Sequence, residues 1–145
     1  MKSRRIAREA ALQFLYQEDF TVMRDQKHGY DLEDRFPLFC SLYLVNKKAR
    51  AYAKSIVAGV CTHLVEIDGE IEDAAKNWRL VRLATIDRNL LRIAIYEMLH
   101  CDDIPDQVAI NEALEIAKKY ANEESPKFIN GVLNTIFTNK KSAEK

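Results

Sequence analysis

Apolar residues recur at helical spacing near both ends of the chain. Residues 3–18 carry an apolar set that repeats as pairs every four residues: Ile6, Ala7, Ala10, Ala11, Phe14 and Leu15. Because about 3.6 residues make one turn, this stripe predicts an amphipathic helix rather than a strand. A second stripe of the same kind predicts a helix over residues 47–64.

The last third of the chain predicts three more helices, over residues 86–100, 106–121 and 125–139. We expect Thr85 to cap the first and Pro105 to separate it from the second. Ser125 followed by Pro126 predicts the start of the third, as a capping hydroxyl and a proline in the first turn. Gly131 inside that helix costs about 1 kcal/mol relative to alanine, and we expect it to permit a close helix contact.

The middle of the chain is less regular. Residues 19–34 predict a loop or a short helix, residues 37–44 are apolar but too short to assign, and residues 67–78 predict a short acidic helix. The chain has only four glycines and three prolines, too few for the many turns of an all-β fold. The predicted fold class is therefore an all-α bundle.

Composition sets the broad class of the protein. A chain of 145 residues with 48% hydrophobic and 30% charged residues has room for one soluble domain. The formal net charge is zero, so any attraction to nucleic acid must be local. We expect no membrane span, because no apolar run approaches about 20 residues. Three widely spaced cysteines favour a reducing compartment, so we expect a cytoplasmic protein.

Three arginines, Arg4, Arg5 and Arg8, open the first helix. The helix dipole disfavours cations there by roughly 0.3–1 kcal/mol each, so their presence needs a reason. One interpretation is contact with phosphates, for which arginine offers paired donors. The other is a solvated, partly frayed helix end, and the spacing alone does not separate the two.

A second candidate surface surrounds the start of the last helix, with Tyr120, Glu124, Lys127 and Phe128. The two aromatic side chains could stack on unpaired bases, although both also fit the apolar stripes of their helices. Lys127 would favour an anion at the helix start. Glu124 would repel phosphate, but it could accept hydrogen bonds from bases or cap the helix.

Nothing in the sequence predicts catalysis, a metal site or a cofactor. His63 stands near Cys61 and His100 beside Cys101, but neither pair has the spacing of a zinc module. The sequence contains no phosphate-binding glycine loop and no nucleophile elbow. We therefore expect a protein that is not an enzyme.

Several motifs together resemble the NusB family of transcription antitermination factors. The C-terminal motifs are Trp78, Arg82-Leu83, Ile86-Asp87-Arg88, LRIAIYE (91–97), Asp103-Ile104-Pro105, VAINEA (108–113), Lys118-Lys119-Tyr120 and KFINGVL (127–133). The N-terminal and central motifs are Arg4-Arg5, Ala7-Arg8-Glu9, Leu12-Gln13, Leu15-Tyr16 and Ala58-Gly59-Val60. Residues 21–46 have no match, so the resemblance depends on the order and spacing of the others.

The resemblance implies a single domain, residues 1–139, of about seven helices in two packed sub-bundles, followed by a basic tail at 140–145. It implies a factor that binds single-stranded boxA RNA together with the ribosomal protein NusE. This complex would join RNA polymerase and other Nus factors, notably on ribosomal RNA operons. A homodimer is left open by the sequence.

The resemblance also implies two sets of site residues. RNA contacts would come from Arg4, Arg5, Arg8, Tyr120, Glu124 and Phe128, to which we add Lys127 for its charge at the start of the last helix. The protein partner would contact Tyr16, Asp87 and Glu97. The alternatives are a helical protein-binding scaffold, or an RNA-binding domain like that fused to ribosomal RNA methyltransferases.

Overall fold

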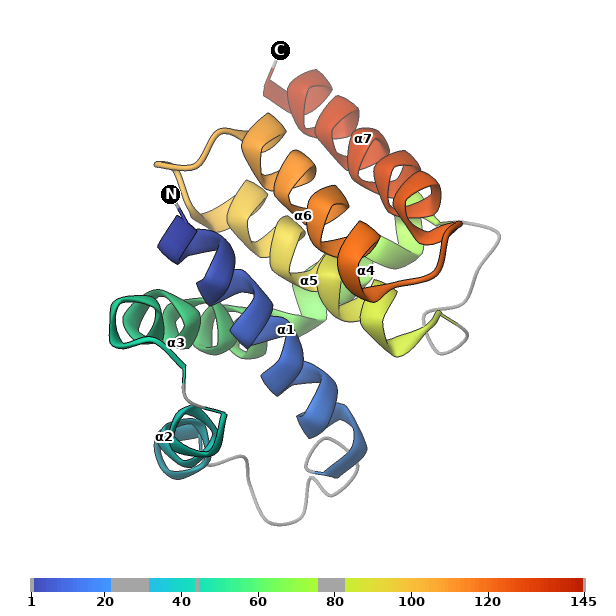
Figure 1. Cartoon of the computed structure of the whole chain (residues 1–145). Coiled ribbons are helices and arrows are strands. Elements are labelled where there is room, and N and C mark those ends of the chain that lie inside the picture. Colours follow the sequence, from blue (N-terminus) through green and yellow to red (C-terminus); the bar gives the residue numbers. More distant parts are fainter. Residues whose placement is uncertain (1, 22–31, 44, 76–82, 145) are drawn as a thin grey trace.

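The described part of the chain is entirely helical in its regular elements (Figure 1). The computed structural model describes residues 2–21, 32–43, 45–75 and 83–144. Its helices are α1 (Lys2–Thr21), α2 (Leu32–Leu42), α3 (Lys47–Thr62), α4 (Leu64–Ala74), α5 (Thr85–His100), α6 (Asp106–Tyr120) and α7 (Ser125–Glu144). The all-α prediction is confirmed. None of these helices combines the length and hydropathy that a membrane-spanning segment requires.

Helix α5 lies at the centre of the molecule and joins two sub-bundles. On one side α1 packs against α3 and α5, with α2 beside α3. On the other side α4, α6 and α7 all pack against α5, and α6 also packs against α7 (Figure 1). Most of α5 is buried for this reason, including polar residues such as Asn89 and Arg92.

The helix pattern of the sequence is confirmed at both ends. All of the predicted α1 stripe is buried except Ile6. The stripe of residues 47–64 divides, because α3 ends at Thr62 and α4 begins at Leu64. The short acidic helix corresponds to α4, which ends at Ala74, and residues 76–78 lie outside the described residues.

Residues 32–42, of uncertain state in the sequence, form helix α2 despite Pro37 in its interior. Aromatic packing holds this helix against α1. Phe14 meets Phe36 and Phe39 edge-on, with ring centroids 5.2 and 5.3 Å apart. These tertiary contacts outweigh the backbone hydrogen bond that Pro37 cannot donate.

Two predicted caps are wrong. Ala84 occupies the N-cap of α5, without a side-chain hydrogen bond, and Thr85 is already the first helical residue. Ser125 is likewise inside α7, and the first helical hydrogen bond runs from the Phe128 N–H to the Glu124 carbonyl. The Ser125 side chain instead hydrogen-bonds to the Asp87 side chain. The Ser125 hydroxyl, which the sequence predicted as the cap of α7, thus takes part in the contact between α5 and α7.

The glycine that permits close packing is Gly59, in α3. A methyl group at Gly59 would overlap the ring of Tyr96 in α5. A methyl group at Gly131 would meet no heavy atom within 4 Å, so the predicted close contact there is wrong. Helix α7 also continues past residue 139, and Lys140 Nζ donates to the Met98 carbonyl at 2.6 Å. The expected domain boundary at residue 139 therefore falls within a helix.

Candidate functional site

Two arginines at the start of α1 lie at the surface in ion pairs. Arg4 Nη2 is 3.1 Å from Asp103 Oδ2, and the Arg5 guanidinium bonds both carboxylate oxygens of Glu112. The Arg4 and Arg5 side chains each keep 46% of their surface exposed. The hydrogen bond from Arg5 lowers the pKa of the Glu112 carboxyl below its usual value, so this pair is ionic at neutral pH.

Arg8, one turn further along α1, is buried. Its Nε donates to both carboxylate oxygens of Glu97, at 2.9 and 3.0 Å, and its Nη1 donates to Glu112 at 3.1 Å. Tyr52 of α3 donates its hydroxyl to the same Glu97 carboxylate. Burial, followed by this hydrogen bond, raises the pKa of Tyr52 above its ordinary value, so the phenol stays protonated. We call Arg8, Tyr52 and Glu97 the inner cluster.

The inner cluster contains two residues that the sequence analysis assigned to binding sites. Arg8 was expected to contact RNA and Glu97 to contact a protein partner. The structure leaves only 3% of Arg8 and 1% of Glu97 exposed. Each satisfies the other's charge between α1 and α5, so their burial disfavours direct contact with a ligand, and both assignments stay predictions.

Surface charges continue from the arginines along the seam between α1 and α6. Lys119 Nζ lies 2.8 Å from Glu9 Oε1, and the Tyr120 hydroxyl donates to the same oxygen at 2.7 Å. Lys119 is 62% exposed. We call Arg4, Arg5, Glu9, Glu112 and Lys119 the α1–α6 strip. The strip ends at Tyr120, where α6 gives way to the connection that leads into α7.

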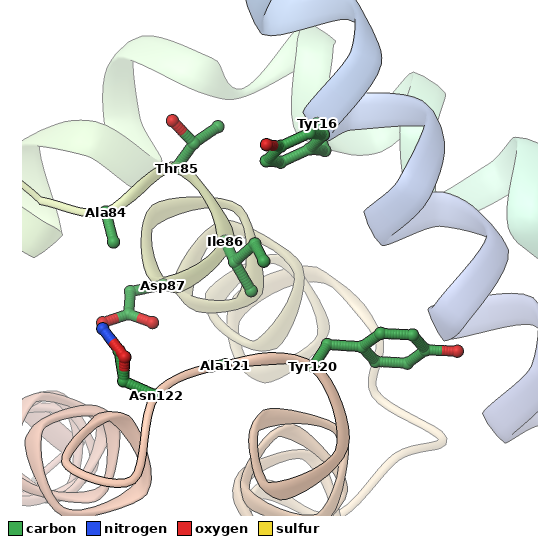
Figure 2. Close-up of a pocket in the computed structure, with 8 residues that line it drawn as sticks. All are labelled: Tyr16, Ala84, Thr85, Ile86, Asp87, Tyr120, Ala121 and Asn122. Atoms are coloured by element: carbon green, nitrogen blue, oxygen red, sulfur yellow. The ribbon is translucent and has the colours of Figure 1, made fainter.

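Beyond Tyr120 the surface opens into a polar pocket of about 380 Å³. It is lined by Tyr16, Ala84, Thr85, Ile86, Asp87, Tyr120, Ala121 and Asn122 (Figure 2). In Figure 2 the Asp87 carboxylate and the Asn122 side chain point toward each other at one end, and Tyr16 lies above the start of α5. A second pocket of about 250 Å³ shares Asp87 and Asn122 and extends to Glu124, Ser125 and Phe128.

Asp87 lines both of these pockets and is largely buried. Only 9% of the residue is exposed, and its Oδ1 has no hydrogen-bond partner. Burial raises the pKa of its carboxyl, and the hydrogen bond from Ser125 offsets part of that rise. A buried acceptor of this kind is costly unless something donates to it, so Asp87 is suited to accept an N–H from a ligand.

An apolar groove of about 560 Å³ adjoins the polar pocket. Its lining is Leu12, Gln13, Tyr16, Gln17, Phe39, Tyr43, Ile86 and Tyr120. Tyr16, Ile86 and Tyr120 line both the groove and the polar pocket. Tyr43, one of the lining residues, keeps 58% of its surface exposed, and the preceding residue Leu42 keeps 69%. Exposed apolar side chains gathered around a groove are typical of a protein-binding surface.

The structure groups the predicted residues differently from the sequence. Tyr16 and Asp87, expected at a protein interface, line the same pockets as Tyr120, Glu124 and Phe128, expected at RNA. Lys127 is exposed in the first turn of α7. Shared residues connect the N-terminal arginines to the start of α7: Tyr120 bonds Glu9 of the strip and lines the first pocket, and Asn122 lines both that pocket and the one that reaches Phe128.

Sequence reasoning did not assign Glu112, Lys119 or Asn122 to the site. Glu112 and Lys119 are seven residues apart in α6 and so share one helix face, a spacing that could have signalled their common role. No local signal marks Asn122, because its place beside Asp87 depends on how α5 and α6 pack.

Comparison with known proteins identifies a family. The sequence model described as "NusB family" matches residues 5–137. The transcription antitermination protein NusB of Desulfotalea psychrophila is 54% identical over 138 residues, covering 95% of this chain and 97% of that protein. NusB of Desulfitobacterium hafniense strain DCB-2 is 43% identical over 134 residues, covering 92% of this chain and 87% of that protein.

Solved structures agree. NusB of T. maritima matches with a TM-score of 0.76 and 38% identity, covering 92% of this chain and 89% of that one. A chain in the crystal structure of the antitermination factors NusB and NusE in complex with double-stranded RNA matches with a TM-score of 0.81. It is 30% identical and covers 96% of this chain and 98% of that one. Relatives of this fold thus include a factor bound to RNA and to NusE.

Proposed function

The chain belongs to the NusB family, and on that premise we propose that it is a transcription antitermination factor that binds single-stranded boxA RNA together with NusE. The observation that carries the proposal is the continuous surface from Arg4 and Arg5 to the polar pocket. Exposed cations lie at one end of this surface, and a buried hydrogen-bond acceptor among aromatic side chains lies at the other. An extended strand of RNA can place its phosphates on the cations and its bases among the aromatic side chains.

The exposed cations would take the phosphates. Arg4 and Arg5 are held by carboxylates, but surface ion pairs contribute only about 0–1 kcal/mol each. Lys119 pairs with Glu9 and keeps 62% of its side chain exposed. A phosphate can therefore replace a carboxylate at little cost and gain paired hydrogen bonds from arginine. Lys127, at the start of α7, would meet the strand beyond the pockets.

The pockets would take the bases. Asp87 Oδ1 and Glu124 would accept hydrogen bonds from base amino groups, and Tyr120 and Phe128 offer aromatic faces. On this proposal Asp87 contacts RNA rather than the protein partner. Arg8 supports the surface from beneath without touching the strand.

The apolar groove would hold NusE. Its lining is mostly apolar, and Tyr16 lies both in the groove and in the polar pocket. A protein in the groove would then adjoin the RNA, and each ligand would raise the affinity for the other. Such a complex, joined to RNA polymerase and other Nus factors in the cytoplasm, suppresses termination by binding and not by catalysis.

RNA binding with and without NusE tests the proposal. We expect boxA RNA to bind more tightly than a scrambled strand of equal length, and NusE to increase the difference. Contact with three to five phosphates predicts a log–log salt slope of about −2 to −3.5. A flat salt response would reject the phosphate contacts, and RNA that adds no affinity for NusE would favour a protein-binding scaffold.

A double variant locates the phosphate contacts. Arg4→Ala with Arg5→Ala should weaken boxA and scrambled RNA to a similar degree and make the salt slope shallower by about 1.4, or 0.7 for each lost contact. Lys47→Ala with Lys48→Ala removes the same charge at the start of α3, outside the strip. An equal loss in this control would mean that net charge, and not the strip, attracts the RNA.

A further inference from the structure

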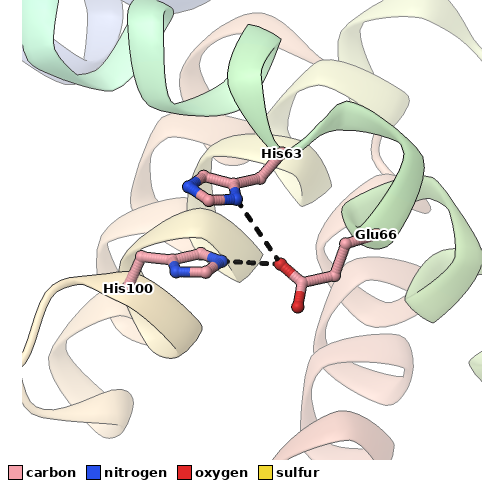
Figure 3. A group of neighbouring side chains, drawn as sticks. All are labelled: His63, Glu66 and His100. Atoms are coloured by element: carbon pink, nitrogen blue, oxygen red, sulfur yellow. Dashed lines mark hydrogen bonds and ion pairs between the residues drawn. The ribbon is translucent and has the colours of Figure 1, made fainter.

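Two histidines and a glutamate meet on the side of the molecule where α3, α4 and α5 join (Figure 3). His63 lies at the junction of α3 and α4, Glu66 in the first turn of α4, and His100 at the end of α5. His100 Nε2 is 2.6 Å and His63 Nδ1 is 3.9 Å from the same Glu66 oxygen. The three donor atoms lie within 4.8 Å of one another.

We propose that these three side chains bind a Zn²⁺ ion. Two imidazole nitrogens and one carboxylate oxygen are a ligand set that zinc accepts, with a fourth position for water. Ligands about 2.0–2.2 Å from a tetrahedral ion are about 3.3–3.6 Å apart. The donors here lie within 4.8 Å of one another and the two rings are nearly parallel, so both imidazoles must turn until their nitrogen lone pairs converge on the ion. This site was not predicted from the sequence, where each histidine was considered only together with its neighbouring cysteine.

The arrangement of the side chains supports a cation. Figure 3 shows a nitrogen of each imidazole directed toward the Glu66 carboxylate. The rings of His63 and His100 are stacked, with centroids 3.8 Å apart and planes inclined by 16°. The stack keeps the two imidazoles side by side next to the carboxylate, so all three ligands come from one small cluster.

The backbone contributes in the same direction. Helix α3 ends at Thr62 and α5 ends at His100, so the C-terminal ends of two helices adjoin the site, against one N-terminal end, that of α4 at Leu64. The helix dipole places partial negative charge at such ends, which favours a cation. Glu66 is 52% exposed and His63 is 38% exposed, so an ion can reach the site from solvent.

Bound zinc would connect the α3–α4 junction to the end of α5, and would thus fasten the two sub-bundles together. The site shares no residue with the α1–α6 strip or the pockets. A failure to bind zinc would therefore not affect the proposed RNA function, and a failure to bind RNA would not affect the proposed zinc site.

Zinc titration of the chelator-treated full chain, by calorimetry and by thermal unfolding, tests the site. We expect one Zn²⁺ per chain and a higher unfolding temperature with zinc. Mg²⁺ should have no such effect, because it prefers oxygen ligands. Absence of zinc binding would overturn the proposal and would leave Glu66 and His100 as a hydrogen-bonded pair only.

Variants identify the ligands. His100→Gln and Glu66→Gln should each weaken zinc binding at least about tenfold, since even second-shell changes cost 10–100-fold. Glu72→Gln, an exposed carboxylate in the same helix, is the matched control and should bind normally. Unchanged affinity in both ligand variants would overturn the site.

Thiolate ligation is the alternative to exclude. The double variant Cys61→Ser, Cys101→Ser should retain zinc binding, and Co²⁺ in the wild-type chain should give no thiolate charge-transfer absorption. Loss of binding in the cysteine variant, or a thiolate band, would assign the ion to another site and refute the proposal.

Discussion

Arg5 and Arg8 stand three residues apart in the same helix and both bond Glu112, yet their environments are opposite. The Arg5 side chain is 46% exposed, although Glu112 itself is only 17% exposed. The Arg8 side chain is 4% exposed and shares the inner cluster with Glu97 and Tyr52. Burial, and not residue type, decides which cation is free to exchange its partner for a ligand.

The same contrast separates two glycines. Gly59 lies where α3 approaches the Tyr96 ring, and Gly131 faces open space. The interior seam between α1, α3 and α5 thus fixes its side chains, whereas the α1–α6 strip and the outer face of α7 tolerate change. Substitutions matched in chemistry but different in location measure this difference directly.

The largest expected effect is that of Arg8→Ala. It would leave the Glu97 carboxylate buried without its charge partner, which destabilises a protein by about 3–5 kcal/mol. Urea unfolding measures the change. Arg5→Ala is the control and should cost at most about 1 kcal/mol, because its ion pair is exposed. Equal losses in the two variants would refute the distinction between the inner cluster and the strip.

The two glycines should respond with opposite signs. Gly59→Ala forces the Tyr96 ring to move, and overpacking of this kind costs about 1–3 kcal/mol, of which better helix propensity recovers at most about 1. Gly131→Ala meets no neighbour, so it should stabilise the protein by about 0.5–1 kcal/mol. Thermal unfolding of both variants checks the signs. A rise in both would show that Tyr96 yields without strain.

Helix periodicity was sufficient to predict most of the fold. The apolar stripes of α1, α3 and α6 have the buried faces that the sequence predicts, because side-chain spacing along a helix is local information. Helix α2 was not assigned, since its stability comes from Phe14, distant in sequence. Residues 22–31 and 76–82 lie outside the described residues, so the predictions that fall there stay predictions.

The candidate site was predicted in its parts but not in its grouping. Arg4, Arg5 and Tyr120 were identified from their types and positions and lie on one surface. Arg8 and Glu97 carry the same charges as their exposed neighbours, so nothing local in the sequence shows that they neutralise each other in the interior. Asp87 and Asn122 adjoin only because α5 and α6 pack together, which is tertiary information.

Asp87 lies between interior and surface, and Asp87→Asn should give the smallest effect. Burial raises the folded-state pKa of this carboxyl, so the unfolded chain loses its proton first as pH rises from the ordinary value of 3.8. The contribution of Asp87 to stability is therefore most favourable in acid and declines as pH rises through the folded-state pKa. The asparagine variant lacks this decline, so its stability relative to wild type should rise as the pH increases from the ordinary carboxyl value of 3.8 through the folded-state pKa. Ser125→Ala removes the hydrogen bond that lowers the pKa of Asp87 and should steepen the decline. A stability difference between the Asp87→Asn variant and wild type that does not change with pH would contradict the prediction, because Asp87 would then ionise as freely in the folded protein as in the unfolded chain.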